Sequence, residues 1–600
     1  MRRYPIFLSL FLSLFIPVFS SAQDEIMPLD QVKRGMKGIG KTVFSGTKVD
    51  DFEVEVLGVM RNISPGRNMI LIKMAGGPLA ETGIISGMSG SPIYIDGKLV
   101  GAISAGWLYP KQPMGLVTPI EEMIEVWDRK ATSEERSSPS FKALAAALRN
   151  GKEEGFGEII PSVEVPAMGG ASFKRLSLPL VLSGFRPDVV DRLSPIFEKL
   201  GFIPIQGGGK VSIPEGEKPE LEPGAAVGVE IMRGDIQAYS YGTLTYRKGN
   251  MVLAYGHSMT GQGDVSFPMS TVYIYSIFPS VVRSFKIGAV ADVVGVISQD
   301  RYSAISGEIG REPEMVPVEI TVKPAFGSKP RSFRAEVVKD RFWLPSMVFS
   351  GVWDAILSWS MYEEGDWTLS IKSRVDIRGH KPLLMEELYS GGSSVPLLAS
   401  LDLGTNLADL VDNPFERAQI ERISVEVSVL ERIEIARIES IRAEKDSVKP
   451  GDSLDIYVTL RPYLQDERIE KVSIPIPDDV PEGPLEIRVV DGKSAIQLEM
   501  ARAPMRFSPT NLDQLIELLG SMPSANEMVI DAFLRKPGVV IKGREMPSIP
   551  SSVLSVLYGS GQSGEISMTQ GISISRIRLK MPFRIIGARM ILVNISRMAR

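Results

Sequence analysis

The sequence predicts a mainly β protein of the α+β class, in which two β-barrel or sandwich-like units precede an immunoglobulin-like sandwich and a β-rich tail. Short runs rich in Val, Ile, Thr and Tyr recur between Gly, Pro and Asp-Gly turns, which is the pattern of strands and hairpins. Few segments show the apolar spacing of an amphipathic helix. At about 150 residues per domain, 600 residues indicate three to five domains.

The amino-acid composition excludes several kinds of functional site. A chain that is 44% hydrophobic and 23% charged is ordinary for a globular protein with sizeable cores. The net charge of -5 offers no basic face, so no nucleic-acid partner is expected. The absence of cysteine excludes disulfides, thiol catalysis and cysteine-ligated zinc. Only His257 and His380 could supply imidazole, so we expect neither a metal site nor a cofactor.

Residues 1–22 have the pattern of a secretory signal peptide. A positively charged start is followed by an apolar stretch at 6–19 and small residues at 20–22, so Gln23 would begin the mature chain. The alternative is an uncleaved anchor, for which the stretch is short. The pattern predicts secretion across the inner membrane into the periplasm or cell envelope. The mature chain would be soluble or associated with the envelope.

The first unit is expected at 28–128. The runs VEVLGVM, MILIKM, SPIYI and LVGAISA suit strands. Asp96 and Gly97 separate two apolar runs and predict a two-residue hairpin turn, since both turn positions need positive φ. A short helix at 119–127 would close this unit.

A polar linker with one helical segment, FKALAAALRN, is expected at 129–160. The second β unit follows at 161–310. Its apolar stripe at 188–200 predicts a helix, and the runs YGTLTY and MVLAY predict paired strands around a turn at 247–250.

Three further segments complete the chain. Residues 311–395 are expected to form a β-rich extension. Residues 396–500 contain short strands separated by Pro-Gly and Asp-Gly turns, a spacing typical of an immunoglobulin-like sandwich. Residues 501–600 predict an α+β tail with a helix at 512–519, for which we expect no role beyond docking or a partner surface.

The loop GMSGSP at 87–92 is the strongest functional signal in the chain. Glycines on both sides of Ser89 allow a sharp bend that exposes the hydroxyl and neighbouring N–H groups. A nucleophile beside an oxyanion hole needs this geometry. Taken alone, the loop is also compatible with a simple tight turn.

The loop and its flanks resemble the SpoIVB-type serine peptidases, the S55 family. The segments that agree in order are GMKGIGKTVFSG at 35–46, FEVEVLGVMRN at 52–62, ILIKMAGGPLAETGIISGMSGSP at 70–92 and VTPIEEM at 117–123. Downstream, GTLTYRKGNMVLAYGHSMTGQGDVSFPM at 242–269 resembles the segment that carries the family's base, and SFKIG at 284–288 and VGVISQDRYSAISG at 294–307 extend the likeness.

The resemblance implies roles for individual residues. Ser89, and not Ser91, would be the nucleophile, and His257 would be its base. The N–H groups of Gly87 and Ser89 would be the oxyanion donors, by the chymotrypsin-type pattern. His380 matches no motif and is expected to be structural.

Two departures from the family pattern affect the third member of a triad. The family has an aspartate at the end of the strand before the serine loop, where this chain has Gly76. Asp264 follows His257 closely and is the candidate substitute; a Ser-His dyad without an acid is the alternative. The serine segment also precedes the histidine segment, which reverses the family order. A working site therefore requires the two β units to pack with the site between them.

These observations support two hypotheses. The first is a secreted serine endopeptidase that cleaves a protein or peptide of the cell envelope through an acyl-enzyme on Ser89. The second is a non-catalytic envelope binding or scaffold protein that retains the S55-like fold and binds extended peptides by strand addition. The distance between the Ser89 hydroxyl and the His257 imidazole discriminates between them.

Overall fold

The structure is a computed structural model, and it confirms the mainly β fold with barrel-like and sheet units. It describes residues 26–107, 110–128, 140–150, 173–207, 213, 219–324, 329–359, 365–536, 538–541, 544–546 and 566–599. The expected signal peptide and most of the expected linker lie outside these residues. In the described part of the chain, no helix has both the length and the apolar character needed to cross a bilayer.

The first unit is a closed barrel of six antiparallel strands, in the order β4-β1-β2-β3-β6-β5 and back to β4. Its strands are β1 (Lys37–Thr42), β2 (Asp50–Ser64), β3 (Arg67–Ala75), β4 (Pro92–Ile95), β5 (Lys98–Gly106) and β6 (Met114–Pro119). Alternate residues of β2, such as Phe52, Val54 and Val56, are buried, because successive side chains of a strand point to opposite faces.

The predicted hairpin and helix of this unit are present. Asp96 and Gly97 have φ of 50° and 76° and connect β4 to β5, as a two-residue turn requires. Helix α2 (Ile120–Asp128) buries Ile120, Met123 and Val126 against the barrel. A short helix, α1 (Leu79–Thr82), precedes the serine loop.

The second unit is also a closed six-stranded barrel, in the order β10-β13-β14-β15-β12-β11 and back to β10. Its strands are β10 (Ala226–Gly234), β11 (Gln237–Lys248), β12 (Met251–Ala254), β13 (Gly263–Phe278), β14 (Phe285–Arg301) and β15 (Ala304–Ile309). The predicted strand pair is β11 and β12, and the predicted helix is α4 (Pro187–Lys199), which packs on β9 (Phe202–Gly207). Strand β8 (Leu178–Ser183) joins β9 to β11.

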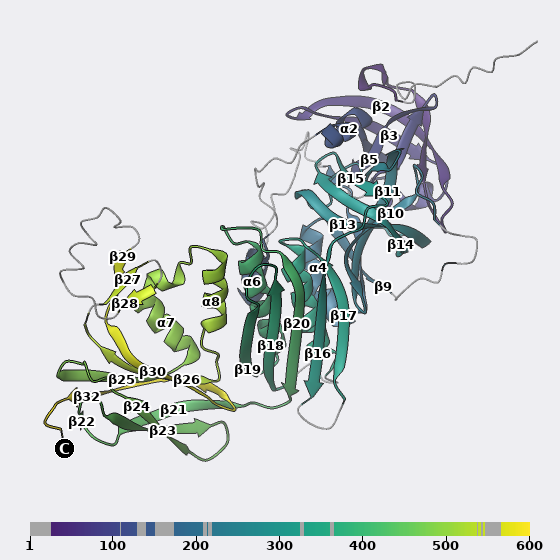
Figure 1. Cartoon of the computed structure of the whole chain (residues 1–600). Helices are drawn as coiled ribbons and strands as arrows, with labels where there is room; N and C mark the ends of the chain where they lie inside the picture. The colour runs from purple at the N-terminus through teal and green to yellow at the C-terminus, as the bar shows by residue number, and fades with distance from the viewer. Residues whose placement is uncertain are drawn as a thin grey trace, which may run out of the picture.

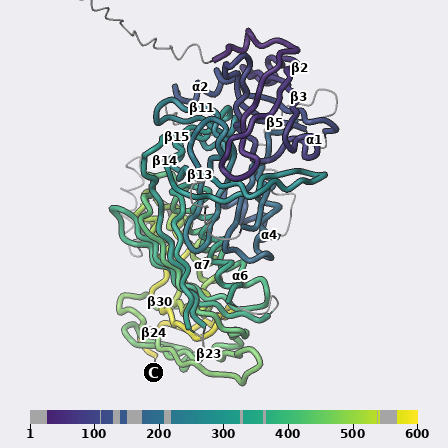
Figure 2. Tube along the Cα trace, turned by 90° about the vertical axis from the view of Figure 1, so that its right-hand side faces the viewer, coloured from purple at the N-terminus to yellow at the C-terminus, as the bar shows by residue number. Residues whose placement is uncertain are grey.

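The two barrels lie side by side, as Figures 1 and 2 both show. Strand β7 (Lys174–Arg175) belongs in sequence to the second unit but pairs with β5 of the first barrel. The packing that the reversed motif order requires is therefore present.

A five-stranded sheet continues from the second barrel, and β17 joins it to β10. Its strands are β16 (Met315–Pro324), β17 (Arg331–Val338), β18 (Trp367–Ile377), β19 (Leu383–Gly391) and β20 (Ile420–Leu430). Helices α3 (Phe141–Asn150), α5 (Trp343–Leu357) and α6 (Val395–Val411) pack together beside it. The boundary expected at residue 396 differs from the structure, because α6 and β20 belong to this unit and β20 pairs with β16.

Helix α5 was not predicted from the sequence. Nearly all of its residues are buried, among them Trp343, Phe349 and Trp353. A helix that is buried on every side has no polar face, so its sequence lacks the amphipathic pattern used to recognise helices.

The C-terminal unit is a two-sheet sandwich with one shared core, seen at the lower left of Figure 1. One sheet contains β21 (Ile435–Ala443), β23 (Ser453–Pro462), β24 (Arg468–Pro475) and β31 (Arg584–Ile586). The other contains β22 (Ser447–Val448), β25 (Gly483–Asp491), β26 (Glu527–Leu534), β30 (Ile572–Lys580) and β32 (Ala588–Ile595). The sandwich thus crosses the expected boundary at residue 500, because β25 pairs with β26 and β32.

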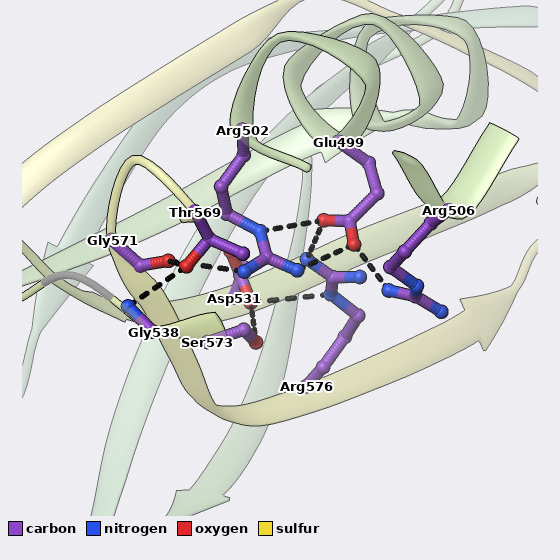
Figure 3. Close-up of polar contacts among 9 residues, drawn as sticks. All are labelled: Glu499, Arg502, Arg506, Asp531, Gly538, Thr569, Gly571, Ser573 and Arg576. Atoms are coloured by element: carbon purple, nitrogen blue, oxygen red, sulfur yellow. Dashed lines mark hydrogen bonds and ion pairs between the residues drawn. The ribbon is translucent and has the colours of Figure 1, made fainter. Parts of the chain in front are cut away.

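Helices α7 (Gly492–Arg502) and α8 (Leu512–Ser521) accompany this sandwich, and α8 is the helix predicted at 512–519. A buried ion network fixes α7 on the sheet (Figure 3). Glu499 accepts two hydrogen bonds from Arg502, at 2.6 and 3.0 Å, and one from Arg576 of β30 at 3.1 Å. It also pairs with Arg506. Burial alone would raise the pKa of Glu499, but these three guanidinium groups outweigh it and hold the pKa at about 2.

We expect Glu499→Gln to destabilise the C-terminal unit by about 3 kcal/mol at pH 7, because it leaves the buried guanidinium group of Arg502 without its counter-charge. The carboxylate's contribution is fully present above its unfolded pKa and is lost as the pH falls towards 2. Chemical denaturation at pH 7 and pH 3 measures both effects. Glu517→Gln, on the neighbouring helix, is the control; equal stability of the two variants at pH 7 would contradict the prediction.

Candidate active site

The serine loop connects α1 to β4 and requires glycine at two places. Gly87 and Gly90 have φ of 98° and 93°, a region that favours glycine. At Gly90 there is also no space for a side chain, since a Cβ atom would lie 2.0 Å from the Thr243 carbonyl oxygen and 2.4 Å from the Tyr255 nitrogen. The loop is thus built to approach the backbone of the second barrel closely.

Strand β11 of the second barrel holds the loop through backbone and hydroxyl groups. The Thr243 N–H donates to the Ser89 carbonyl at 2.8 Å, and its hydroxyl donates to the Gly87 carbonyl at 3.0 Å. The Thr245 hydroxyl donates to the Gly90 carbonyl at 2.7 Å. Both threonines belong to the GTLTY run, so this run serves to fix the serine loop in place.

His257 follows β12 through a strained turn. Tyr255 and Gly256 have φ of 70° and 69°, and a bulky residue in this region is an outlier of the kind that clusters at functional sites. Thr118 of the first barrel donates to the Gly256 carbonyl at 2.7 Å. The turn brings His257 Nε2 to 2.9 Å from Ser89 Oγ. The structure therefore brings together the two residues that the sequence paired across 168 positions.

The second ring nitrogen determines the direction of this hydrogen bond. His257 Nδ1 lies 2.7 Å from the Ser258 carbonyl oxygen, which can only accept. Nδ1 must therefore carry the proton, and in the neutral ring Nε2 is the acceptor. Ser89 donates its hydroxyl hydrogen to Nε2, as the proton transfer from a nucleophile to its general base requires.

Burial and a neighbouring cation keep the imidazole neutral. Burial, followed by the charge of Arg175, lowers the pKa of His257 from 6.5 to about 3, while the hydrogen bond to the Ser258 carbonyl acts in the opposite direction. Arg175 Nη1 donates to the same carbonyl at 3.1 Å and lies 3.3 Å from the Ser258 hydroxyl. At neutral pH His257 is thus unprotonated, which is the form in which Nε2 can accept a hydrogen bond from Ser89.

This low pKa predicts a pH-dependent stability. Between pH 6.5 and pH 3 the unfolded chain binds a proton at His257 that the native state does not, so the free energy of unfolding falls as the pH is lowered. We expect the wild type to lose about 2.5 kcal/mol more than His257→Gln between pH 7 and pH 4.5. Urea denaturation of both proteins at the two pH values measures this difference. Equal losses in wild type and His257→Gln would contradict the prediction.

The backbone around Ser89 offers two free donors. Among the described residues, neither the Gly87 N–H nor the Ser89 N–H has a hydrogen-bond acceptor, whereas Met88 and Gly90 donate to the carbonyls of Ile85 and Ile103. Buried N–H groups are nearly always paired. Two unpaired donors beside a serine hydroxyl suit a developing oxyanion, which is the role expected for them from the sequence.

The structure does not bring Asp264 to His257. The Asp264 side chain is 49% exposed and forms an ion pair with Arg301 at 2.8 Å. His380, in the turn between β18 and β19, contacts Asp513 of α8 at 2.8 Å. Asp264 was expected near His257 because the two residues are close in sequence, but Asp264 belongs to β13, which leads away from the histidine loop.

Three residues near the pair were missed by sequence reasoning. Asp300 is buried and binds the loop after His257, and it lies within the segment VGVISQDRYSAISG whose likeness to the family was already noted. Arg175 reaches the loop from β7, far away in the chain. Lys286 is fully buried, with Nζ 2.7 Å from the Thr42 hydroxyl, and its stem would be 3.1 Å from a Cβ atom at Gly87. No local pattern signals such contacts.

Access to the pair is closed in this conformation. Ser89 is 0% and His257 6% exposed. A cavity of about 1610 Å³ lies next to the histidine loop and is lined by residues 261–267, Asp300 and parts of 311–344 and 411–420, but not by the pair itself. A substrate can reach Ser89 only if a surrounding segment moves. Among the described residues, no group of three or more potential ligand side chains is placed to hold a metal ion.

Comparisons with known proteins add one finding. The model of the family described as SpoIVB peptidase S55 matches residues 17–124. No curated protein and no solved structure matches the chain. The matched segment includes Ser89 and Gly87 and ends well before His257. Residues 17–124 thus match a SpoIVB peptidase S55 domain, as the motifs around Ser89 predicted, and this match suggests a serine peptidase.

Proposed function

We propose that the protein is a secreted serine endopeptidase that cleaves a protein or peptide of the cell envelope. The observation that carries the proposal is the 2.9 Å contact of Ser89 Oγ with His257 Nε2, in the only tautomer that the Ser258 carbonyl allows. The family match at residues 17–124 supports the same chemistry. Secretion and the envelope location rest on the signal-like segment at 1–22.

The chemistry follows from the placement of these groups. Ser89 Oγ attacks the carbonyl carbon of a peptide bond while His257 Nε2 takes the hydroxyl proton. The N–H groups of Gly87 and Ser89 stabilise the oxyanion of the tetrahedral intermediate. The imidazolium then gives its proton to the leaving amine, and an acyl-enzyme remains. Water, with His257 again as base, hydrolyses the ester and frees Ser89.

The test is covalent labelling of the purified chain from Gln23 onward with a fluorophosphonate probe between pH 6 and pH 9. We expect labelling of the wild type that is lost in Ser89→Ala and in His257→Ala. Ser91→Ala and His380→Gln are the matched controls, because their hydroxyl and imidazole do not contact the pair, and both should label. Failure of a folded wild type to label after prolonged incubation would overturn the proposal.

A second function has two observations in its favour. The pair is closed to solvent and no side-chain carboxylate among the described residues binds His257, which suits a binding protein that retains the fold without cutting. Such a protein would bind unfolded casein equally well as wild type and as Ser89→Ala, and would leave it intact. Cleavage of casein by the wild type alone would exclude this alternative.

A further inference from the structure

The loop that follows His257 is held by one buried carboxylate. Asp300, at the end of β14, accepts hydrogen bonds from three consecutive N–H groups: Met259 at 2.7 Å, Thr260 at 2.7 Å and Gly261 at 2.8 Å. The Thr260 hydroxyl adds a fourth at 3.0 Å. A carboxylate that accepts several backbone hydrogen bonds fixes the backbone strongly, because each bond is charge-assisted. Asp300 thus determines the path of the chain directly after the candidate base.

The first carbonyl of this loop receives two donors. His257 Nδ1 donates to the Ser258 oxygen at 2.7 Å and Arg175 Nη1 donates to it at 3.1 Å. Arg175 is itself anchored by its Nη2 on the Leu200 carbonyl at 2.5 Å. It comes from β7, the strand that pairs with the first barrel, so its position depends on the contact between the barrels.

We propose that Asp300 and Arg175 are positioning residues for the Ser89–His257 pair, and that the Ser258 carbonyl they hold does for His257 what a side-chain carboxylate does in a triad. Asp300 fixes the loop through its N–H groups and Arg175 fixes the carbonyl from the other side. The carbonyl then sets the tautomer and the orientation of the ring. The role of this arrangement in catalysis rests on the proposed peptidase function. Its effect on the tautomer and orientation of the His257 ring does not depend on that function.

The arrangement has a chemical cost and a chemical benefit. A carbonyl carries only a partial charge, so it stabilises the imidazolium of the transition state less than a carboxylate would. Loss of the triad aspartate slows a chymotrypsin-type enzyme by about 10⁴-fold, mainly through the wrong tautomer. Here the carbonyl keeps the correct tautomer, so only the electrostatic part of that loss applies. Among the described residues, the charge of Arg175 acts on His257, the Tyr255 ring lies 6.4 Å from the imidazole, and Asp300 holds the adjoining loop through residues 259–261.

The experiment uses the two histidines of the chain. Full-length mature protein labelled with ¹⁵N-histidine gives two imidazole signals, and His380→Gln assigns them. We expect His257 to show the Nδ1–H tautomer at pH 7 and to remain unprotonated at pH 5. Asp300→Asn should release the loop, produce a mixture of tautomers and slow fluorophosphonate labelling about 100-fold, the effect of a displacement of about 1 Å. Asp264→Asn is the matched control and should leave the signals and the labelling rate unchanged.

A second variant keeps the test decisive if Asp300→Asn does not fold. Arg175→Gln removes the neighbouring cation, so the pKa of His257 should rise, and a protonated signal should appear at a higher pH than in the wild type. The inference is overturned if folded Asp300→Asn retains the tautomer, the titration and the labelling rate of the wild type. If Asp300→Asn does not fold, the same result for Arg175→Gln overturns it. In both cases the peptidase proposal stands. If the His257 tautomer changes in these variants but neither the wild type nor any variant is labelled by the probe, the inference is supported and the peptidase proposal is rejected.

Discussion

Replacing Ser89 and His257 together is expected to slow casein hydrolysis no more than replacing either residue alone. The two side chains are 2.9 Å apart and act as one unit, because the hydroxyl is a weak nucleophile until Nε2 takes its proton. In subtilisin, loss of the serine or the histidine costs as much as loss of the entire triad, about 2 × 10⁶-fold, whereas loss of the aspartate costs about 3 × 10⁴-fold. In an enzyme whose histidine has no carboxylate partner, loss of the serine or the histidine should therefore lower the rate by a smaller factor.

These magnitudes bound the expected result. If the Ser258 carbonyl replaces none of the carboxylate's effect, each single variant loses about 100-fold; if it replaces all of it, about 10⁶-fold. The measurement is the rate of cleavage of fluorescently labelled casein by wild type, Ser89→Ala, His257→Ala and the double variant. Additive losses in the double variant would show that the two residues act independently, which contradicts a nucleophile-base pair. His380→Gln should retain the wild-type rate.

Gly90→Ala is expected to reduce the free energy of unfolding by more than about 4 kcal/mol, a loss outside the ordinary range for point variants. The new methyl group would lie 2.0 Å from the Thr243 carbonyl oxygen and 2.4 Å from the Tyr255 nitrogen, both of which are backbone atoms that cannot turn aside. The loop or the second barrel must shift, and the Thr243 hydrogen bond to Ser89 is lost with that shift. Urea denaturation with a fluorescence readout measures the change.

Gly97→Ala separates this steric effect from backbone strain. Gly97 has a φ of 76°, close to that of Gly90, but a Cβ atom there would meet nothing within 4 Å. Its substitution should cost only the strain of a left-handed conformation, about 1–2 kcal/mol. A Gly90→Ala variant no less stable than Gly97→Ala would show that the serine loop does not press on the second barrel as the structure has it.

Much of the local structure was predictable because it depends on near neighbours in the chain. Asp96 and Gly97 specify a turn that any flanking strands would share, and the stripe at 188–200 specifies a helix whatever it packs on. The resemblance to the family motifs also pointed to Ser89 and His257, because each motif must shape its own loop. Elements without a local pattern were missed, as with α5, whose burial on all sides removes the polar face.

The sequence by itself determined the β-rich fold class, the hairpin at Asp96, the glycine-bound serine and the histidine that could serve it. Only the tertiary structure decided which residues surround them. It closed two six-stranded barrels, joined Ser89 to His257 between them, placed Asp264 on Arg301 and brought in Asp300 and Arg175. The physical reason is that a strand's register and a barrel's closure depend on pairing between distant segments, and a shift by one residue turns every side chain to the other face.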